Sequence, residues 1–173
     1  SIVLASAPRE VNRWAQRRQN RALIMISQAP IFTIHAELAD IRHFGQTPYG
    51  ERRVIDILGG RVEGPRLNGK ILPGADWQIV RPDGVADLKA RYGIETDDGA
   101  RVLVHSDGLR HGPPDVIAAL ARGETVEPSR YYFRTVMRFE SAAPALAWLN
   151  RILALGTGAR ERRAVHLDVY EVV

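Results

Sequence analysis

The chain has 173 residues, of which 45% are hydrophobic and 25% charged, the balance of one globular domain long enough to bury a core. It contains no cysteine, which excludes disulfides, thiol catalysis and cysteine-ligated metals. This composition is compatible with a reducing cytoplasm, where we expect the protein to be located. No apolar run approaches the roughly 20 residues that cross a bilayer, and the first residues lack the order of a secretory signal.

The net charge of +4 lies entirely in the first 24 residues, which contain five arginines and one glutamate. The rest is formally neutral and lacks the basic stripe of a nucleic-acid-binding body, so a nucleic-acid partner is not expected. We therefore divide the chain into a basic N-terminal arm, residues 1–29, and a single domain, residues 30–173. Residues 9–24 fit a helix with a sparse apolar face. The arm is predicted to be an appendage without chemistry of its own; a role on a membrane surface or nucleic acid is the alternative.

From residue 30 onward, apolar and polar side chains alternate, which is typical of half-buried β-strands. The alternation is visible in residues 32–38 and clearest in residues 85–96. In the second segment, Leu88, Tyr92 and Ile94 are predicted to face the interior, and the charged residues between them to face solvent.

Turn signals recur every several residues and divide the pattern into about nine or ten short strands. Asp83-Gly84 and Asp98-Gly99 suit hairpin turns, and Gly59-Gly60 and Pro73-Gly74 are further turn signals. One helix is predicted over residues 113–123, because prolines open it and a glycine ends it. This order favours a closed antiparallel barrel or a sandwich over βαβ units, and closure would also remove exposed strand edges.

A series of motifs follows this pattern along the chain: GERRVIDILGGRVEGPRLNGKILPGADWQIVRPDG, ARYGIETDDGA, GLRHGPP, YYFRT, RFE, WLNR and LDVYEV. Their order and density resemble the bacterial and fungal family called domain of unknown function 3237, or uncharacterised protein family 0311. The resemblance covers residues 30–173 and leaves residues 1–29 outside. It implies an all-β fold with one or two short helices, an antiparallel lipocalin/calycin-like β-barrel, often paired as a homodimer. It implies no particular reaction.

Metal and nucleotide sites have little support in the sequence. His35 with Glu37, and His166 with Asp168, would each place two ligands on one strand face, but each pair is more simply a polar, solvent-facing strand side. The segment 156–158 lacks the third glycine and the following helix of a dinucleotide fingerprint, and no Walker lysine or nucleophile elbow is present. We therefore predict neither a cofactor nor a metal.

The predicted site consists of residues that interrupt apolar strands or flank glycine turns, each within a motif of the resembled family. A barrel wide enough for one ligand would present such groups inward among aromatic side chains. The candidate catalytic residues are Glu63, Asp76, Arg110, Tyr132, Arg134 and Asn150. The candidate ligand-binding residues, expected to form apolar wall, are Trp77 and Trp148.

These residue types suit proton-transfer chemistry. A carboxylate desolvated beside tryptophan favours its neutral form and can act as a general acid or base near neutral pH. Arginine offers a bidentate fork to a substrate carboxylate or enolate, and tyrosine and asparagine can stabilise an oxyanion. The set predicts a small-molecule-binding barrel with cofactor-free acid–base catalysis, as a lyase, isomerase or hydrolase, on a small organic acid or aromatic compound.

Three alternatives stay open. The barrel is a non-catalytic carrier or sensor if its lumen is lined only by apolar groups. It is an interaction module if the basic N-terminal arm carries the binding. Finally, the charged residues could serve only as internal ion pairs, Glu63 or Asp76 with Arg134 or Arg110, because buried charges need partners.

Overall fold

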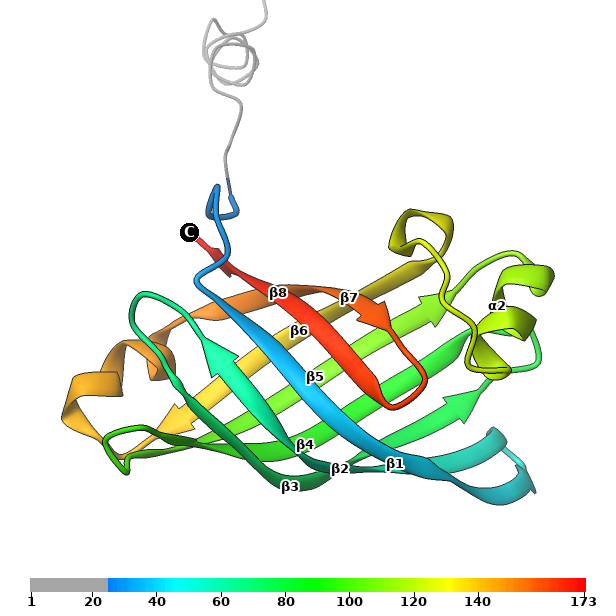
Figure 1. Cartoon of the computed structure of the whole chain (residues 1–173), viewed down its shortest axis with the longest axis horizontal. Helices are drawn as coiled ribbons and strands as arrows, with labels where there is room; N and C mark the ends of the chain where they lie inside the picture. Colours follow the sequence, from blue (N-terminus) through cyan, green and yellow to red (C-terminus); the bar gives the residue numbers. More distant parts are fainter. Residues whose placement is uncertain (1–24) are drawn as a thin grey trace, which may run out of the picture.

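The computed structural model describes residues 25–173, so the predicted arm helix over residues 9–24 lies outside the described residues. Eight strands form a closed barrel in which each strand is antiparallel to its neighbours and β8 closes on β1 (Figure 1). The strands are β1 (Phe32–Thr47), β2 (Gly50–Glu63), β3 (Gly69–Val80), β4 (Ala86–Thr96), β5 (Arg101–His111), β6 (Tyr132–Ser141), β7 (Leu153–Arg160) and β8 (Ala164–Val172). The predicted all-β class and antiparallel barrel are confirmed, and the consecutive strand order is compatible with a lipocalin-like architecture.

The strands are longer and fewer than the nine or ten predicted, because two of the glycine signals lie inside strands. Gly60 has a φ of +132° within β2, where the β1–β2 pairing shifts register nearby. A Cβ at this position would lie 1.9 Å from the carbonyl oxygen of His35, so the close approach of the two backbones requires glycine. Pro73-Gly74 likewise lies within β3, at a register shift against β4.

Three short helical segments occupy the two ends of the barrel. Helix α2 (Pro114–Ala121) lies at one end and confirms the helix predicted over residues 113–123. The 3-10 segment η1 (Pro128–Arg130) follows it, and η2 (Pro144–Arg151) lies at the opposite end (Figure 1). Leu146 and Leu149 of η2 are buried, so this segment plugs its end of the barrel. The two ends, named here the α2 end and the η2 end, therefore differ.

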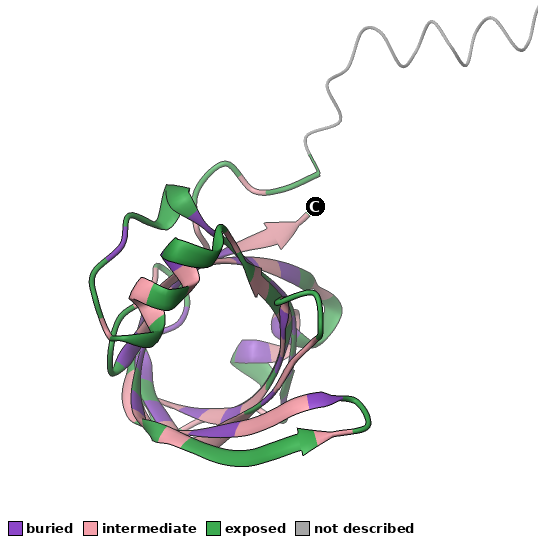
Figure 2. Ribbon diagram, turned by 90° about the vertical axis from the view of Figure 1, so that its right-hand side faces the viewer, coloured by how far each residue is buried: buried purple, intermediate pink, exposed green. Residues whose placement is uncertain are grey.

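Buried residues alternate with exposed or intermediate ones along the strands that form the ring (Figure 2). On β4, Leu88, Tyr92 and Ile94 are buried, as predicted, while Lys89 is exposed. On β6 the alternation is strict along its whole length. The core is therefore the filled interior of the barrel, and only part of it remains open as a cavity.

Residues 25–29, which the sequence assigns to the arm, run beside the last strand. Ile26 forms a bridge with Val172, and the Ser27 backbone N–H donates to the Glu171 carbonyl at 2.8 Å. These contacts tie the entry of the described chain to β8. The described residues include no helix that is long and apolar enough to cross a membrane.

Candidate functional site

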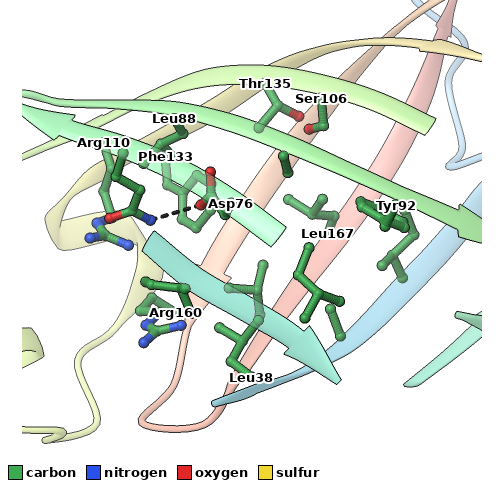
Figure 3. Close-up of a pocket in the computed structure, with 17 residues that line it drawn as sticks. Leu38, Asp76, Leu88, Tyr92, Ser106, Arg110, Phe133, Thr135, Arg160 and Leu167 are labelled. Atoms are coloured by element: carbon green, nitrogen blue, oxygen red, sulfur yellow. Dashed lines mark hydrogen bonds between the residues drawn. The ribbon is translucent and has the colours of Figure 1, made fainter. Parts of the chain in front are cut away.

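A cavity of about 50 Å³ lies within the barrel and is lined mostly by inward-facing apolar side chains. Its polar groups are distributed unevenly. Figure 3 shows Arg110, Asp76 and Arg160 on one side of the cavity and Tyr92 on the opposite side, with Thr135 and Ser106 between them. The lining is therefore neither wholly apolar, as expected of a carrier, nor uniformly polar.

The charged side of the cavity opens toward the α2 end. Here a second hollow of about 360 Å³, named the mouth, is bounded by α2, by Asp40 and by five arginines, of which Arg53, Arg110 and Arg160 belong to strands. Arg110 and Arg160 line both the mouth and the inner cavity. The three arginines come from β2, β5 and β7, and closure of the barrel brings them together. A ligand entering from the α2 end would meet these guanidinium groups first.

Asp76 is the only acidic residue that lines the inner cavity within the described part of the chain. It faces inward because the register shift between Leu72 and Ala75 changes the parity of β3. Before the shift Ile71 is the buried residue, and after it Asp76 and Gln78 line the cavity. The carboxylate accepts hydrogen bonds from the Gln78 side-chain Nε2 at 2.7 Å and from the Lys89 backbone N–H at 3.0 Å.

Gln78 connects this carboxylate to the arginines. Its side chain is 2% exposed, and its Oε1 accepts a hydrogen bond from Arg53 Nε at 2.9 Å while its Nε2 donates to Asp76. An amide is suited to this position, because it offers an acceptor to the guanidinium and a donor to the carboxylate. Gln78 therefore orients Asp76 and Arg53 relative to each other.

Burial shifts the protonation equilibrium of Asp76 toward the neutral acid. Its pKa is raised above the ordinary value, chiefly by desolvation, even though the Gln78 hydrogen bond, the charge of Arg110 and the Lys89 N–H oppose the shift. Such a carboxyl group can exchange a proton with a bound molecule closer to neutral pH than an exposed aspartate can.

The arginines are also held in an unfavourable environment. The pKa of Arg110 is lowered to about 10, chiefly by burial and in addition by the positive charges of Arg53 and Arg160, against the favourable charge of Asp76. Burial is likewise the main cause of the lowered pKa of Arg53 and of Arg160. All three still carry their charge at neutral pH. Within residues 25–173 none of them forms an ion pair with a carboxylate. The negative charge of Asp76 acts on all three arginines, and that of Glu51 acts on Arg53 as well.

Of the six candidate catalytic residues, the structure brings Asp76 and Arg110 together in the cavity and places the other four elsewhere. Glu63 lies exposed at the η2 end of β2, with its carboxylate 3.9 Å from Arg61 Nε. Asn150 belongs to η2, where its amide donates to the Ser141 carbonyl and accepts from the Ser141 N–H. Glu63 is the last residue of β2, and Asn150 connects η2 to the end of β6. Neither residue lines the lumen.

Tyr132 and Arg134 lie on the outer face of β6. The sequence correctly separates β6 into two faces, but the buried face is the one carrying Phe133, Thr135 and Met137. Tyr132 is 44% exposed, and the Arg134 guanidinium carbon lies 5.5 Å from the centroid of its ring. The expectation that these two reach the lumen is corrected, because the apolar face of the strand packs inward.

The two candidate wall tryptophans also lie away from the cavity. Trp77 is 49% exposed on the outside of β3, since its neighbours Asp76 and Gln78 take the inward positions. Trp148 lies in η2 with the Arg66 guanidinium 3.8 Å above its ring. Asp76 is therefore desolvated by the barrel interior and not by a tryptophan. The alternative internal ion pairs, Glu63 or Asp76 with Arg134 or Arg110, are likewise not found among the ion pairs of the described residues.

Sequence reasoning missed Arg53, Gln78 and Arg160. Arg160 could have been found from the alternation of β7. Ala154, Gly156 and Gly158 are the buried, inward-facing residues of this strand, and Arg160 is the next residue with the same parity. A charged residue on such a face marks a functional or strained position. Gln78 shares parity with Asp76 and is buried, whereas nothing in the sequence distinguishes Arg53 from the adjacent Arg52.

The histidine pairs lie outside the barrel wall. His35 and His166 are partners across β1 and β8, with ring nitrogens 3.2 Å apart, and His166 Nε2 lies 3.1 Å from a Glu161 carboxylate oxygen. Among residues 25–173 there is no group of three or more histidine, cysteine, aspartate or glutamate residues arranged to hold a metal ion.

The fold and the site define a class: a closed eight-stranded antiparallel barrel whose lumen has one charged, open end. The chain belongs to the family described as protein of unknown function (DUF3237), whose model matches residues 26–172. It is 45% identical to a UPF0311 protein of Rhodopseudomonas palustris over 144 residues, 83% of this chain and 94% of the relative.

Solved structures agree with this family. A conserved protein of unknown function from Rhodopseudomonas palustris superimposes with a TM-score of 0.80 at 44% identity, covering 86% of this chain and 97% of that one. A β-barrel-like protein from Acinetobacter baumannii gives a TM-score of 0.73 at 41% identity over 84% and 95% of the two chains. More distantly, the hydroalkoxylation enzyme phnH of Penicillium herquei is 23% identical over 116 residues, 67% of this chain and 63% of the relative.

An enzyme from Penicillium herquei also shares the fold, with a TM-score of 0.55 at 19% identity over 83% of this chain and 96% of that chain.

Proposed function

We propose that this barrel binds a small organic anion at the charged end of its lumen and catalyses cofactor-free proton transfer on it, with Asp76 as the general acid or base. The observation that carries the proposal is the composition of that end: one carboxyl group with a raised pKa lies beside three half-buried arginines that form no ion pair with a carboxylate of residues 25–173. A buried excess of positive charge is unfavourable in the empty protein and favourable when an anion binds.

The roles of the residues follow from their chemistry. Arg110 and Arg160 line both hollows and offer planar, multiple donors to a carboxylate, enolate or phenolate. Asp76 lies beside them and gives a proton to the bound molecule or takes one from it. Gln78 holds Asp76 in place. Because the arginines keep their charge, they also stabilise negative charge that develops during the proton transfer.

The name of one distant relative supports this class of chemistry. The Penicillium herquei protein is called a hydroalkoxylation enzyme. Hydroalkoxylation adds an alcohol O–H across a carbon–carbon double bond: the O–H bond and the π bond of the alkene break, a C–O and a C–H bond form, and there is no net oxidation or reduction. An acid that protonates one alkene carbon, and whose carboxylate then accepts the hydroxyl proton, suffices for such a step. Asp76 has the raised pKa that this exchange favours.

Proton transfer can be tested before the natural substrate is known. Phenylpyruvate is a small aromatic keto acid with exchangeable protons beside its carbonyl, and its exchange in D₂O can be followed by NMR. The parent protein is expected to accelerate exchange above the buffer rate, and Asp76→Asn to lose the acceleration. The matched control is Asp168→Asn, which removes an exposed carboxylate from the outer surface of β8. Acceleration that survives Asp76→Asn would contradict the proposed role.

A carrier function has its own supporting observation, because most of the inner cavity is apolar. The same experiment separates the two functions. A parent protein that binds phenylpyruvate in calorimetry without accelerating exchange is a carrier, and the catalytic part of the proposal then falls. No preference for the acid over neutral phenylacetone would contradict anion binding itself.

We also propose that the protein pairs as a homodimer through the outer face of β5, β6 and β7. This face carries large exposed apolar side chains, and a surface groove of about 570 Å³ runs along it. The exposed apolar residues are Leu103, Leu109, Tyr132, Val136 and Leu153. An identical copy could cover such a patch through a two-fold axis. Light scattering should give twice the chain mass for the parent and the single mass for Val136→Glu.

We also propose the cytoplasm as the compartment of the protein, because the chain has no cysteine.

A further inference from the structure

Two hydroxyl groups deep in the inner cavity lack hydrogen-bond partners. Tyr92 Oη and Thr135 Oγ1 are both fully shielded from bulk water, and neither has a partner among the atoms of the described residues. Tyr92 is 7% exposed and Thr135 is 5% exposed, so each is more than nine-tenths buried. Both line the cavity that contains Asp76. A buried hydroxyl without a partner is unfavourable, and the great majority of buried polar groups in proteins form at least one hydrogen bond.

We propose that the Tyr92 and Thr135 hydroxyls form a second subsite, the hydroxyl subsite, which binds an uncharged oxygen atom of the substrate. This inference rests on the proposed function, because it assigns the other end of the same bound molecule. The substrate class becomes a bifunctional one: an acidic group at the arginines and a hydroxyl, carbonyl or ether oxygen at the far side of the cavity (Figure 3).

A glycine on the neighbouring strand leaves room for the Thr135 hydroxyl. Gly156 of β7 lies across from Thr135, and a Cβ there would stand 2.4 Å from Thr135 Oγ1. Any larger residue at this position would displace the hydroxyl or fill its space. Ser106, 3% exposed, lines the same cavity on β5. The wall at this depth is thus made of small and hydroxyl-bearing residues.

The chemistry of the hydroxyl subsite differs from that of the arginines. Burial and the nearby charge of Asp76 raise the pKa of Tyr92 above its ordinary value, so its hydroxyl stays protonated and can donate as well as accept. Two neutral hydroxyls do not compensate a second negative charge. The hydroxyl subsite therefore selects a neutral oxygen, and a dicarboxylate would be bound less well.

The spacing sets the length of the ligand. Phe133 is paired with Arg110 across β5 and β6, and Thr135 lies two residues farther along β6. At the usual rise per residue of a strand, the position of Thr135 is therefore about 7 Å along the strand from that of Arg110. A benzene ring that carries its two polar groups in para positions spans a comparable length. The inner cavity, at about 50 Å³, leaves space for a compact ligand only.

Benzoate and 4-hydroxybenzoate are a matched pair of probes for isothermal titration calorimetry with the full chain. Benzoate tests the arginine end alone, and the added hydroxyl tests the hydroxyl subsite. The parent is expected to bind 4-hydroxybenzoate about 3- to 10-fold more tightly than benzoate, the gain of one or two net hydrogen bonds. Tyr92→Phe and Thr135→Val should each reduce this preference, and the double variant should abolish it, without changing benzoate affinity. Tyr49→Phe, at a residue 76% exposed, is the matched control.

The outcomes separate the two levels of inference. Absence of benzoate binding to the parent would overturn the proposed anion site. Benzoate binding without any preference for the hydroxylated probe would overturn the hydroxyl subsite alone. An equal loss of affinity for both probes in Tyr92→Phe or Thr135→Val would also overturn it, because it would show a change of cavity shape. Thermal unfolding of each variant checks folding, and the parent's own preference between the probes tests the hydroxyl subsite even if one variant fails to fold.

Discussion

The two ends of the barrel differ in the side chains that occupy the interior. At the η2 end, Phe32 and Phe139 pack edge to face with ring centroids 5.5 Å apart, and Leu149 of η2 is fully buried. At the α2 end the interior residues include Arg53, Arg110 and Arg160. The first arrangement removes apolar surface from water and stabilises the fold. The second places charge in an environment that disfavours it, as is common at functional sites. The comparison indicates that the η2 end stabilises the barrel, and it supports the proposal that a ligand binds at the α2 end.

The largest effect is expected at the closed end. Leu149→Ala leaves a cavity where no solvent enters, and it should lower the free energy of unfolding by about 2–5 kcal/mol. Urea denaturation followed by circular dichroism measures it. A loss below about 1 kcal/mol would show that η2 is not part of the core and would remove the contrast between the ends.

The matched substitution at the open end should act in the opposite direction on stability. Arg110→Gln removes a guanidinium that burial and two neighbouring arginines disfavour, so the free protein should unfold at the same or a higher temperature. Benzoate affinity should fall by about 10-fold or more, since a charged hydrogen-bonding partner is lost. Arg110→Lys, which keeps the charge but loses the planar fork, should bind more weakly than the parent. A destabilised Arg110→Gln with normal binding would assign Arg110 a structural role.

The pH dependence of stability should distinguish Asp76 from the surface carboxylates. Because its pKa is raised on folding, Asp76 contributes stability below its unfolded pKa of about 3.9, and this contribution is lost as the pH rises through the folded pKa. Relative to Asp76→Asn, the parent should therefore lose stability as the pH rises from about 4 through the folded pKa of Asp76. Asp97, whose pKa is lowered by the hydrogen bond from Arg61, should show the reverse trend in Asp97→Asn. Parallel curves for the parent and Asp76→Asn would contradict the buried carboxyl.

The smallest effect is expected on the outer surface. Lys89 faces solvent on β4 between the inward-facing Leu88 and Ala90. Lys89→Ala should change the free energy of unfolding by less than about 0.5 kcal/mol and should leave benzoate binding unaltered. A larger effect on either would mean that the facing of β4 has been misjudged.

The sequence by itself determined the class of fold and much of the local structure. The alternation in residues 85–96, the hairpin turns at Asp83-Gly84 and Asp98-Gly99 and the helix after Pro113 follow from side-chain parity and backbone preference, which act over a few residues. The separation of β6 into two faces also follows from side-chain parity. The sequence also singled out Asp76 and Arg110 as polar residues within apolar strands, and the structure places both in the cavity.

The tertiary structure alone decided which groups meet. The inward direction of Asp76 depends on the register shift of β3 against β4, which no alternation in the chain reveals. Arg53, Asp76 and Arg160 are far apart in sequence, and they converge because the strands pair in order and β8 closes on β1. Closure also decided that the apolar face of β6 packs inward and leaves Tyr132 and Arg134 outside. A period of two identifies the faces of a strand, whereas the composition of a site depends on contacts between strands that only the closed barrel specifies.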